Sequence, residues 1–133
     1  SPIIKPGEAN IILAFELLEA LRWLPSLAKT GEMIVNTQQM DPMPVVIGDM
    51  AYPQDALVRI QKTAKTTIAL DALKIALACQ NPKGVNVVLL GVLSARMDIP
   101  ERVWLDVLKN TVPSQFIEAN LAAFAAGRVY GSK

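Results

Sequence analysis

Histidine is absent from these 133 residues, and Cys79 is the single cysteine. Without an imidazole, the chain lacks the commonest general base at neutral pH and the commonest nitrogen ligand for metals. One thiol cannot form an internal disulfide, and iron–sulfur clusters and structural zinc sites need several thiolates or imidazoles. The composition therefore predicts no catalytic residue and no metal site here, and it disfavours an enzyme that works alone.

Two further features are missing. Thirteen basic and twelve acidic residues leave a net charge of +1, so there is no basic field for nucleic acid. No apolar run reaches the roughly 18 residues that a membrane span needs, and the opening SPIIKPGE lacks the apolar stretch of a signal peptide. We therefore expect a cytoplasmic protein that binds neither nucleic acid nor membrane. The glycines at 31, 48, 84 and 91 are isolated, so no complete dinucleotide site is encoded.

Hydrophobic residues make up 52% of the sequence, which is enough for one core, and we expect a single domain over residues 1–133. Its centre is residues 10–37. Residues 11–15 and 32–36 are apolar runs typical of strands buried on both faces, and leucines at helical spacing predict a helix over residues 16–28 between them. Gly31 is expected to end that helix. Two buried strands joined by a crossover helix imply parallel pairing.

The rest of the chain extends this pattern. We expect a loop at residues 38–44, a short strand at 45–47, a helix at 53–64 and a strand at 66–70, after which the sequence predicts helices only. Residues 86–97 are apolar nearly all round, so they should be covered by the domain or by another chain. A helix from Pro100 should turn Val103, Trp104 and Val107 inward, and the last six residues should form a loose tail. The predicted fold class is α/β, an open Rossmann-like three-layer sheet with flanking helices and a helical C-terminal third.

In open α/β sheets, ligands bind beyond the carboxyl ends of the strands. In this sequence, polar residues occur at those positions. Glu16 follows the first strand, Asn36 and Thr37 end the second, and Asp71 follows the third. Glu16, Asn36 and Thr37 are therefore our candidate cofactor-binding rim. The alternative is that Glu16 and Asp71 only serve the N-termini of the helices that follow them.

Other polar and sulfur-containing side chains are expected to be structural. Asn81, Asn86 and Asn120 lie beside or within apolar helices, where a buried amide must find partners. Cys79 lies among apolar helical residues with only Lys74 as a nearby cation, so the sequence predicts a buried, inert thiol.

The chain resembles the gamma subunit or gamma domain of the 2-oxoacid:ferredoxin oxidoreductases, and more closely the small subunit of the indolepyruvate-specific branch of that family. The resemblance is carried in order by SPII and GEAN, LAFELLEALRWLPSL, IVNTQQMDPMPV, ALDA, NPKGVNVVLLGVLS, and the closing VP with IEANLAAFAAG. Because these segments span almost the whole sequence and keep their order, the match is more specific than any short motif here.

The resemblance implies an accessory subunit in the coenzyme A-dependent oxidative decarboxylation of a 2-oxoacid, with aryl pyruvates such as indolepyruvate as the favoured substrates. It implies a large catalytic partner subunit that carries thiamine diphosphate and iron–sulfur clusters, with electrons passing indirectly to ferredoxin. No cofactor is expected on this chain itself. When isolated, it could form a homo-oligomer.

One departure from the family pattern is large. The family has a first strand and a GxGGQG-type turn before the segment that corresponds to Ser1, and this sequence contains neither. We therefore expect a processed or truncated piece, the C-terminal two-thirds of a gamma-type domain, whose sheet lacks the first family strand. The alternative function is a non-redox nucleotide-binding or scaffold module of similar fold.

Overall fold

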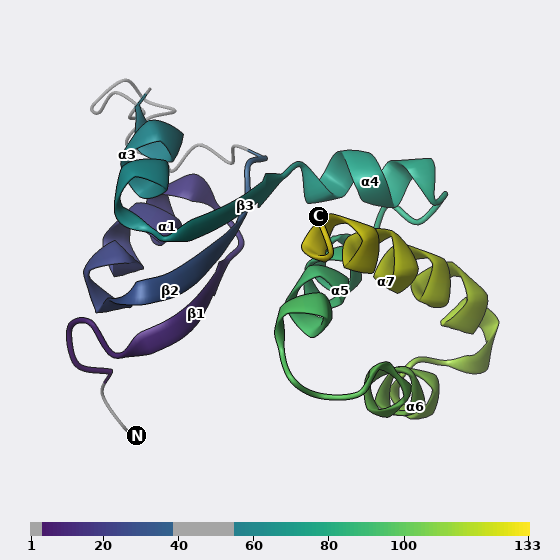
Figure 1. The fold of residues 1–133 in the computed structure, drawn as a ribbon. Helices are drawn as coiled ribbons and strands as arrows, with labels where there is room; N and C mark the ends of the chain where they lie inside the picture. Colours follow the sequence, from purple (N-terminus) through teal and green to yellow (C-terminus); the bar gives the residue numbers. More distant parts are fainter. Residues whose placement is uncertain (1–3, 39–54) are drawn as a thin grey trace. The chain divides into compact units, whose positions relative to one another are not determined.

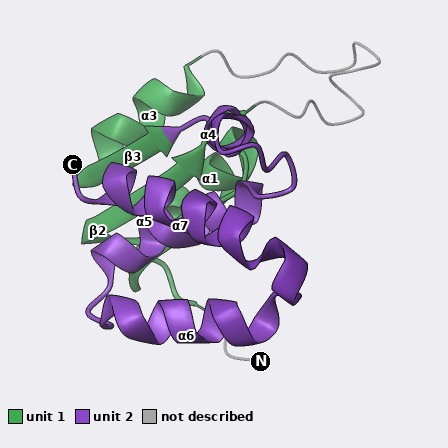
Figure 2. Ribbon diagram, turned by 90° about the vertical axis from the view of Figure 1, so that its right-hand side faces the viewer, with its two compact units in different colours: residues 1–69 green, residues 70–133 purple. Residues whose placement is uncertain are grey.

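The computed structural model describes residues 4–38 and 55–133. The chain divides into two compact units, Ser1–Ala69 and Leu70–Lys133, where the sequence predicts one domain (Figure 2). The loop predicted at residues 38–44, apart from Gln38, and the short strand predicted at residues 45–47 fall outside the described residues.

The first unit is built on a three-stranded parallel sheet in the order β1-β2-β3. Ala14 of β1 pairs with Val35 of β2, and the parallel pairing of these two strands confirms the prediction. The register shifts once, between Ala9 and Ile11. The elements are β1 (Ala9–Ala14), α1 (Leu17–Trp23), the 3₁₀ turn η1 (Leu24–Ser26), β2 (Leu27–Asn36), α3 (Ala56–Thr63) and β3 (Thr66–Leu70).

Helices α1 and α3 lie on one face of the sheet (Figure 1). Met33 and Val35 point to that face because side chains alternate along a strand, and both are fully buried. The core that they share with the two helices consists of side chains: Ala14, Leu17, Ala20, Leu27, Met33, Val35, Ala56, Ile60 and Ala64. The first unit by itself therefore has two layers, helices on sheet. The wider prediction of an α/β fold with flanking helices and a helical C-terminal part is confirmed.

The predicted helix at residues 16–28 is wrong at its end. Helix α1 stops at Trp23, because Pro25 has no N–H to bond the carbonyl of Leu21 and continue the helix. The chain then makes one 3₁₀ turn and enters β2 at Leu27. Gly31 accordingly lies inside β2, without positive φ, and does not cap a helix.

The first strand is also less buried than predicted. Only Ala14 of β1 is buried, and Phe15 lies beyond the strand with 52% of its surface exposed. The reason is position, because β1 is an edge strand of the described sheet and lacks a neighbour on one side.

The second unit is helical, as predicted. It contains α4 (Ala72–Ala78), α5 (Val85–Arg96), α6 (Glu101–Thr111), the 3₁₀ turn η2 (Ser114–Phe116) and α7 (Ile117–Gly131). Helices α5 and α7 touch through their backbones, since a Cβ added at Gly91 or Gly127 would overlap a carbonyl oxygen of the other helix. Val88, Leu89 and Val92 are fully buried, which confirms the prediction of a covered helix.

Three predictions for this unit need correction. The last six residues are not a loose tail, because α7 continues to Gly131, whose carbonyl accepts a hydrogen bond from Arg96 Nη1 at 3.1 Å. Val103 and Val107 are not covered, and 40% and 60% of their surfaces are exposed. Cys79 is half-buried, with Sγ 3.8 Å from the Ala122 carbonyl oxygen.

The predicted structural roles of Asn81 and Asn120 are confirmed. Asn81 Nδ2 donates to the Ala119 carbonyl oxygen at 3.4 Å and to Asn120 Oδ1 at 3.3 Å, and Asn120 Nδ2 donates to the Phe116 carbonyl oxygen at 2.9 Å. These bonds fasten the loop after α4 to the start of α7, so the two amides are structural, as predicted. Asn86 is exposed on α5.

Candidate functional site

The carboxyl ends of β1 and β2 meet at one edge of the sheet. Because Ala14 is opposite Val35 in a parallel pair, the chain leaves both strands at the same edge, Glu16 after β1 and Asn36 and Thr37 at the end of β2. This is the arrangement on which the predicted rim depends. The binding role of these three residues stays a prediction.

Glu16 has a clear local task. Its backbone is extended, and its carboxylate oxygen Oε2 accepts a hydrogen bond from the Glu19 N–H at 3.1 Å, so it caps α1. A capping side chain satisfies one of the N–H groups that a helix start leaves without partners. Glu16 is only half-buried, so solvent still reaches part of the residue.

Asn36 is more deeply buried than Glu16, whereas Thr37 falls in the same range as Glu16. Asn36 is 3% exposed, and its Oδ1 accepts a hydrogen bond from the Gln38 N–H at 3.4 Å, which turns the chain as it leaves β2. Thr37 is half-buried. This end of the sheet thus combines a half-buried carboxylate, a buried amide and a half-buried hydroxyl. These groups can hydrogen-bond a polar ligand, but they offer no nucleophile or base arrangement.

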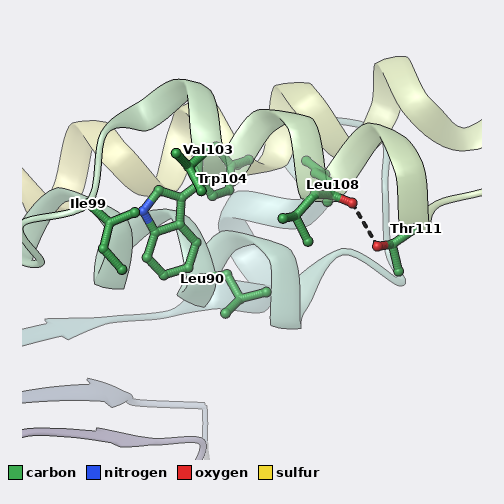
Figure 3. A pocket seen from close by; sticks show the side chains of 8 residues that line it. Leu90, Ile99, Val103, Trp104, Leu108 and Thr111 are labelled. Carbon is green, nitrogen blue, oxygen red and sulfur yellow. Dashed lines mark hydrogen bonds between the residues drawn. The ribbon is translucent and has the colours of Figure 1, made fainter.

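A feature that the sequence did not reveal is an apolar groove of about 430 Å³ in the second unit (Figure 3). Ile99 and Trp104 lie at one end and Leu108 and Thr111 at the other. We call it the α6 groove, and its lining residues are Leu90, Ile99, Val103, Trp104, Val107, Leu108, Thr111 and Phe124. The spacing of Val103, Trp104 and Val107 predicted an apolar face, but such spacing is the same whether the face is covered or open.

A smaller cavity of about 230 Å³ borders the edge strand β1 in the first unit. It is lined by Ile4, Ala9, Ile11, Ile12, Leu13, Trp23 and Ser26. Neither of these two cavities is lined by Glu16, Asn36 or Thr37.

The donor set does not fit an iron–sulfur cluster. In residues 4–38 and 55–133, no group of three or more histidine, cysteine, aspartate or glutamate side chains is placed to hold a metal ion. Cys79 is the only thiolate source, and four are the usual requirement of a cluster. In the same residues, no helix is both long and apolar enough to pass through a lipid bilayer.

The fold is that of a known class of oxidoreductase subunits. The gamma subunit of a keto/oxoacid ferredoxin oxidoreductase from Geobacter sulfurreducens superposes with a TM-score of 0.68 at 20% identity, covering 97% of this chain and 68% of that one. The PORC subunit of a pyruvate oxidoreductase from Thermotoga maritima gives a TM-score of 0.63 at 18% identity, covering 91% and 62%. At these identities, the likeness establishes the fold.

Sequence comparison gives the family. The model of the pyruvate ferredoxin/flavodoxin oxidoreductase family matches residues 1–130, and this chain belongs to that family. Indolepyruvate oxidoreductase subunits IorB from Methanothermobacter thermautotrophicus and Thermococcus kodakarensis are 32% and 34% identical over 129 and 130 residues, each match covering 94% of this chain. The chain spans 66% and 64% of the lengths of these two relatives.

Proposed function

We propose that this chain forms part of an accessory, gamma-type subunit of a 2-oxoacid:ferredoxin oxidoreductase that acts on indolepyruvate or a related aryl pyruvate. The observation that carries the proposal is the family match over residues 1–130, together with curated relatives that are indolepyruvate oxidoreductase subunits. The absence of histidine and the single cysteine are consistent with an accessory role, because the chain offers few groups for chemistry of its own.

In this proposal, the partner is a large catalytic subunit that holds thiamine diphosphate and iron–sulfur clusters. Those groups supply decarboxylation and electron transfer, and ferredoxin receives the electrons from the partner. This chain would contribute binding surface. We place the assembly in the cytoplasm, because coenzyme A and ferredoxin are intracellular molecules.

We further infer that residues 1–133 correspond to the C-terminal two-thirds of a gamma-type domain. The chain covers 64–66% of the length of the two curated relatives, which supports the fraction of two-thirds. The intact mass of the natural subunit and its upstream coding sequence test this inference. A mature protein that begins at Ser1 would contradict it.

The test of the function is reconstitution of the full subunit that contains this chain with the large subunit of the same organism. We expect coenzyme A-dependent reduction of ferredoxin by indolepyruvate only when both are present, with a higher kcat/KM for indolepyruvate than for pyruvate. Full activity of the large subunit alone, or no stable association between the two, would overturn the accessory role. A reversed substrate preference would overturn the aryl pyruvate assignment alone.

Within that assembly, we propose that Glu16, Asn36 and Thr37 border the site that receives coenzyme A. The matched pair of variants is Thr37→Ala, directly after β2, and Thr30→Ala, in the first half of the strand and away from the rim. We expect Thr37→Ala to raise the KM for coenzyme A severalfold and Thr30→Ala, at an exposed position, to leave it unchanged. Equal KM values in the two variants would remove Thr37 from the proposal.

A further inference from the structure

Helix α6 is attached to the second unit more loosely than its neighbours. Among the α-helices in residues 4–38 and 55–133, α6 alone has no buried residue, and only Trp104, Leu105 and Leu108 are half-buried. Val103 and Val107, on its apolar face, border the open α6 groove. The packing that would fix this helix is therefore largely missing.

Few polar contacts join α6 to the other helices of the second unit. Within residues 70–133, the pair between Arg128 Nε and Glu101 Oε2, 3.0 Å apart, is the one ion pair or hydrogen bond that joins α6 to another helix. Arg128 Nη1 also donates to Ser94 Oγ at 2.9 Å, so this arginine links α6 to both α5 and α7. The Glu101 side chain is 52% exposed, and exposed pairs stabilise proteins little.

One ring contact completes the attachment. The Trp104 and Phe124 rings lie with centroids 6.4 Å apart and planes inclined by 35°. Both contacts lie in the first half of α6, whereas the groove runs along both halves, from Val103 to Thr111 (Figure 3). Pro113 follows the helix and supplies no N–H, so α6 cannot run on into α7.

We propose that α6 opens as one unit away from α5 and α7, with residues 97–100 and 112–113 as hinges, while α5 and α7 stay packed. Regions with few buried apolar contacts open locally at far lower free energy than the core. A helix of 11 residues is also below the length at which isolated helices are stable in water, so α6 depends on contacts that are few. Opening uncovers Phe124, which is 2% exposed when α6 is closed, and so exposes the floor of the α6 groove.

Amide hydrogen exchange on the full chain tests this proposal. We expect the amides of α6 to exchange at least about tenfold faster than those in the middle of α5 and α7, and to share one opening rate because they open together. Exchange of α6 at the same rate as α5 would overturn the proposal, since the three helices would then open only as a block.

Two neighbouring variants sharpen the test. Glu101→Gln removes the ion pair with Arg128, and Arg102→Gln removes a charge that joins no ion pair within residues 70–133. We expect Glu101→Gln to speed exchange in α6 by about two- to fivefold without changing α5 or α7, and Arg102→Gln to have no such effect. Equal acceleration in all three helices by Glu101→Gln would show unfolding of the whole unit and would contradict an independent α6.

Discussion

Each of the two units has its own kind of internal packing. In the sheet unit, the core is made of side chains, with Met33 and Val35 of β2 packed against α1 and α3. In the helical unit, the central pair α5 and α7 meets backbone to backbone at Gly91 and Gly127. Side-chain cores tolerate exchanges that keep the volume, whereas a backbone contact leaves no room for even one added carbon.

The largest effect should come from emptying the sheet core. Met33 is fully buried, so Met33→Ala leaves a cavity and should lower the free energy of unfolding by about 2–5 kcal/mol. Met33→Leu keeps most of the volume and should cost less than about 1.5 kcal/mol. Urea unfolding followed by circular dichroism measures both. If Met33→Leu lowered the free energy of unfolding by clearly more than that, this core would tolerate changes of side chain as poorly as the contact between α5 and α7.

The next effect tests the helical unit. A Cβ at Gly127 would overlap the carbonyl oxygen of Val88, so Gly127→Ala must push α5 and α7 apart. We expect a loss of about 1–3 kcal/mol, the usual cost of overpacking. This loss runs against helix propensity, which favours Ala over Gly by about 1 kcal/mol.

The control for Gly127→Ala is Ala125→Gly, at an exposed position two residues earlier in α7. It changes propensity alone and should cost about 0.5–1 kcal/mol. If Gly127→Ala instead stabilised the chain in urea unfolding, the close approach of the two helices would be wrong.

Much of this architecture could be predicted from local sequence. The strand at residues 66–70 was predicted with the observed bounds, because the β-branched and apolar run TTIAL ends at Asp71, which caps α4 through the Lys74 N–H at 3.0 Å. The buried helix was predicted because residues 86–97 have little polar surface, and Val88 is indeed fully buried. In both cases, the residue types within the segment are enough to predict its structure and its burial.

The errors arise where the environment is decided by distant residues. Leu24 and Leu27 continue the helical spacing of α1, yet Pro25 removes the backbone donor and Leu27 starts β2. The prediction of a loose tail for RVYGSK rests on the general disorder of chain termini. Its order comes instead from Gly131, whose Cβ position lies 2.5 Å from the Val92 carbonyl oxygen of α5. No window of the sequence contains both partners of that contact.

For the candidate site, the sequence predicts which polar residues follow the strands, and the register of β1 and β2 brings them to one edge. It cannot say whether such residues bind a ligand or cap a helix. Glu16 shows why, since its carboxylate oxygen accepts a hydrogen bond from the Glu19 N–H at 3.1 Å while the residue is only half-buried. A capping side chain and a ligand-binding side chain have the same sequence signature at a strand end.

The smallest effects come from the two caps, one in each unit. Asp71 is among the preferred N-cap residues and Glu16 is not, although each bonds the N–H three residues on. We expect Asp71→Ala to cost about 1 kcal/mol and Glu16→Ala about 0.5 kcal/mol in the free energy of unfolding. Equal losses would mean that the longer glutamate side chain caps as well as aspartate does.

Glu16→Ser then separates capping from binding in the sheet unit. Serine is a good N-cap, so this variant should unfold at the same urea concentration as the parent protein although the carboxylate is gone. If Glu16 borders the coenzyme A site, the KM for coenzyme A in the assembled oxidoreductase should rise equally in Glu16→Ser and Glu16→Ala, because both lack the carboxylate. A normal KM in Glu16→Ser would show that Glu16 only caps α1, and the proposed rim would then be limited to Asn36 and Thr37.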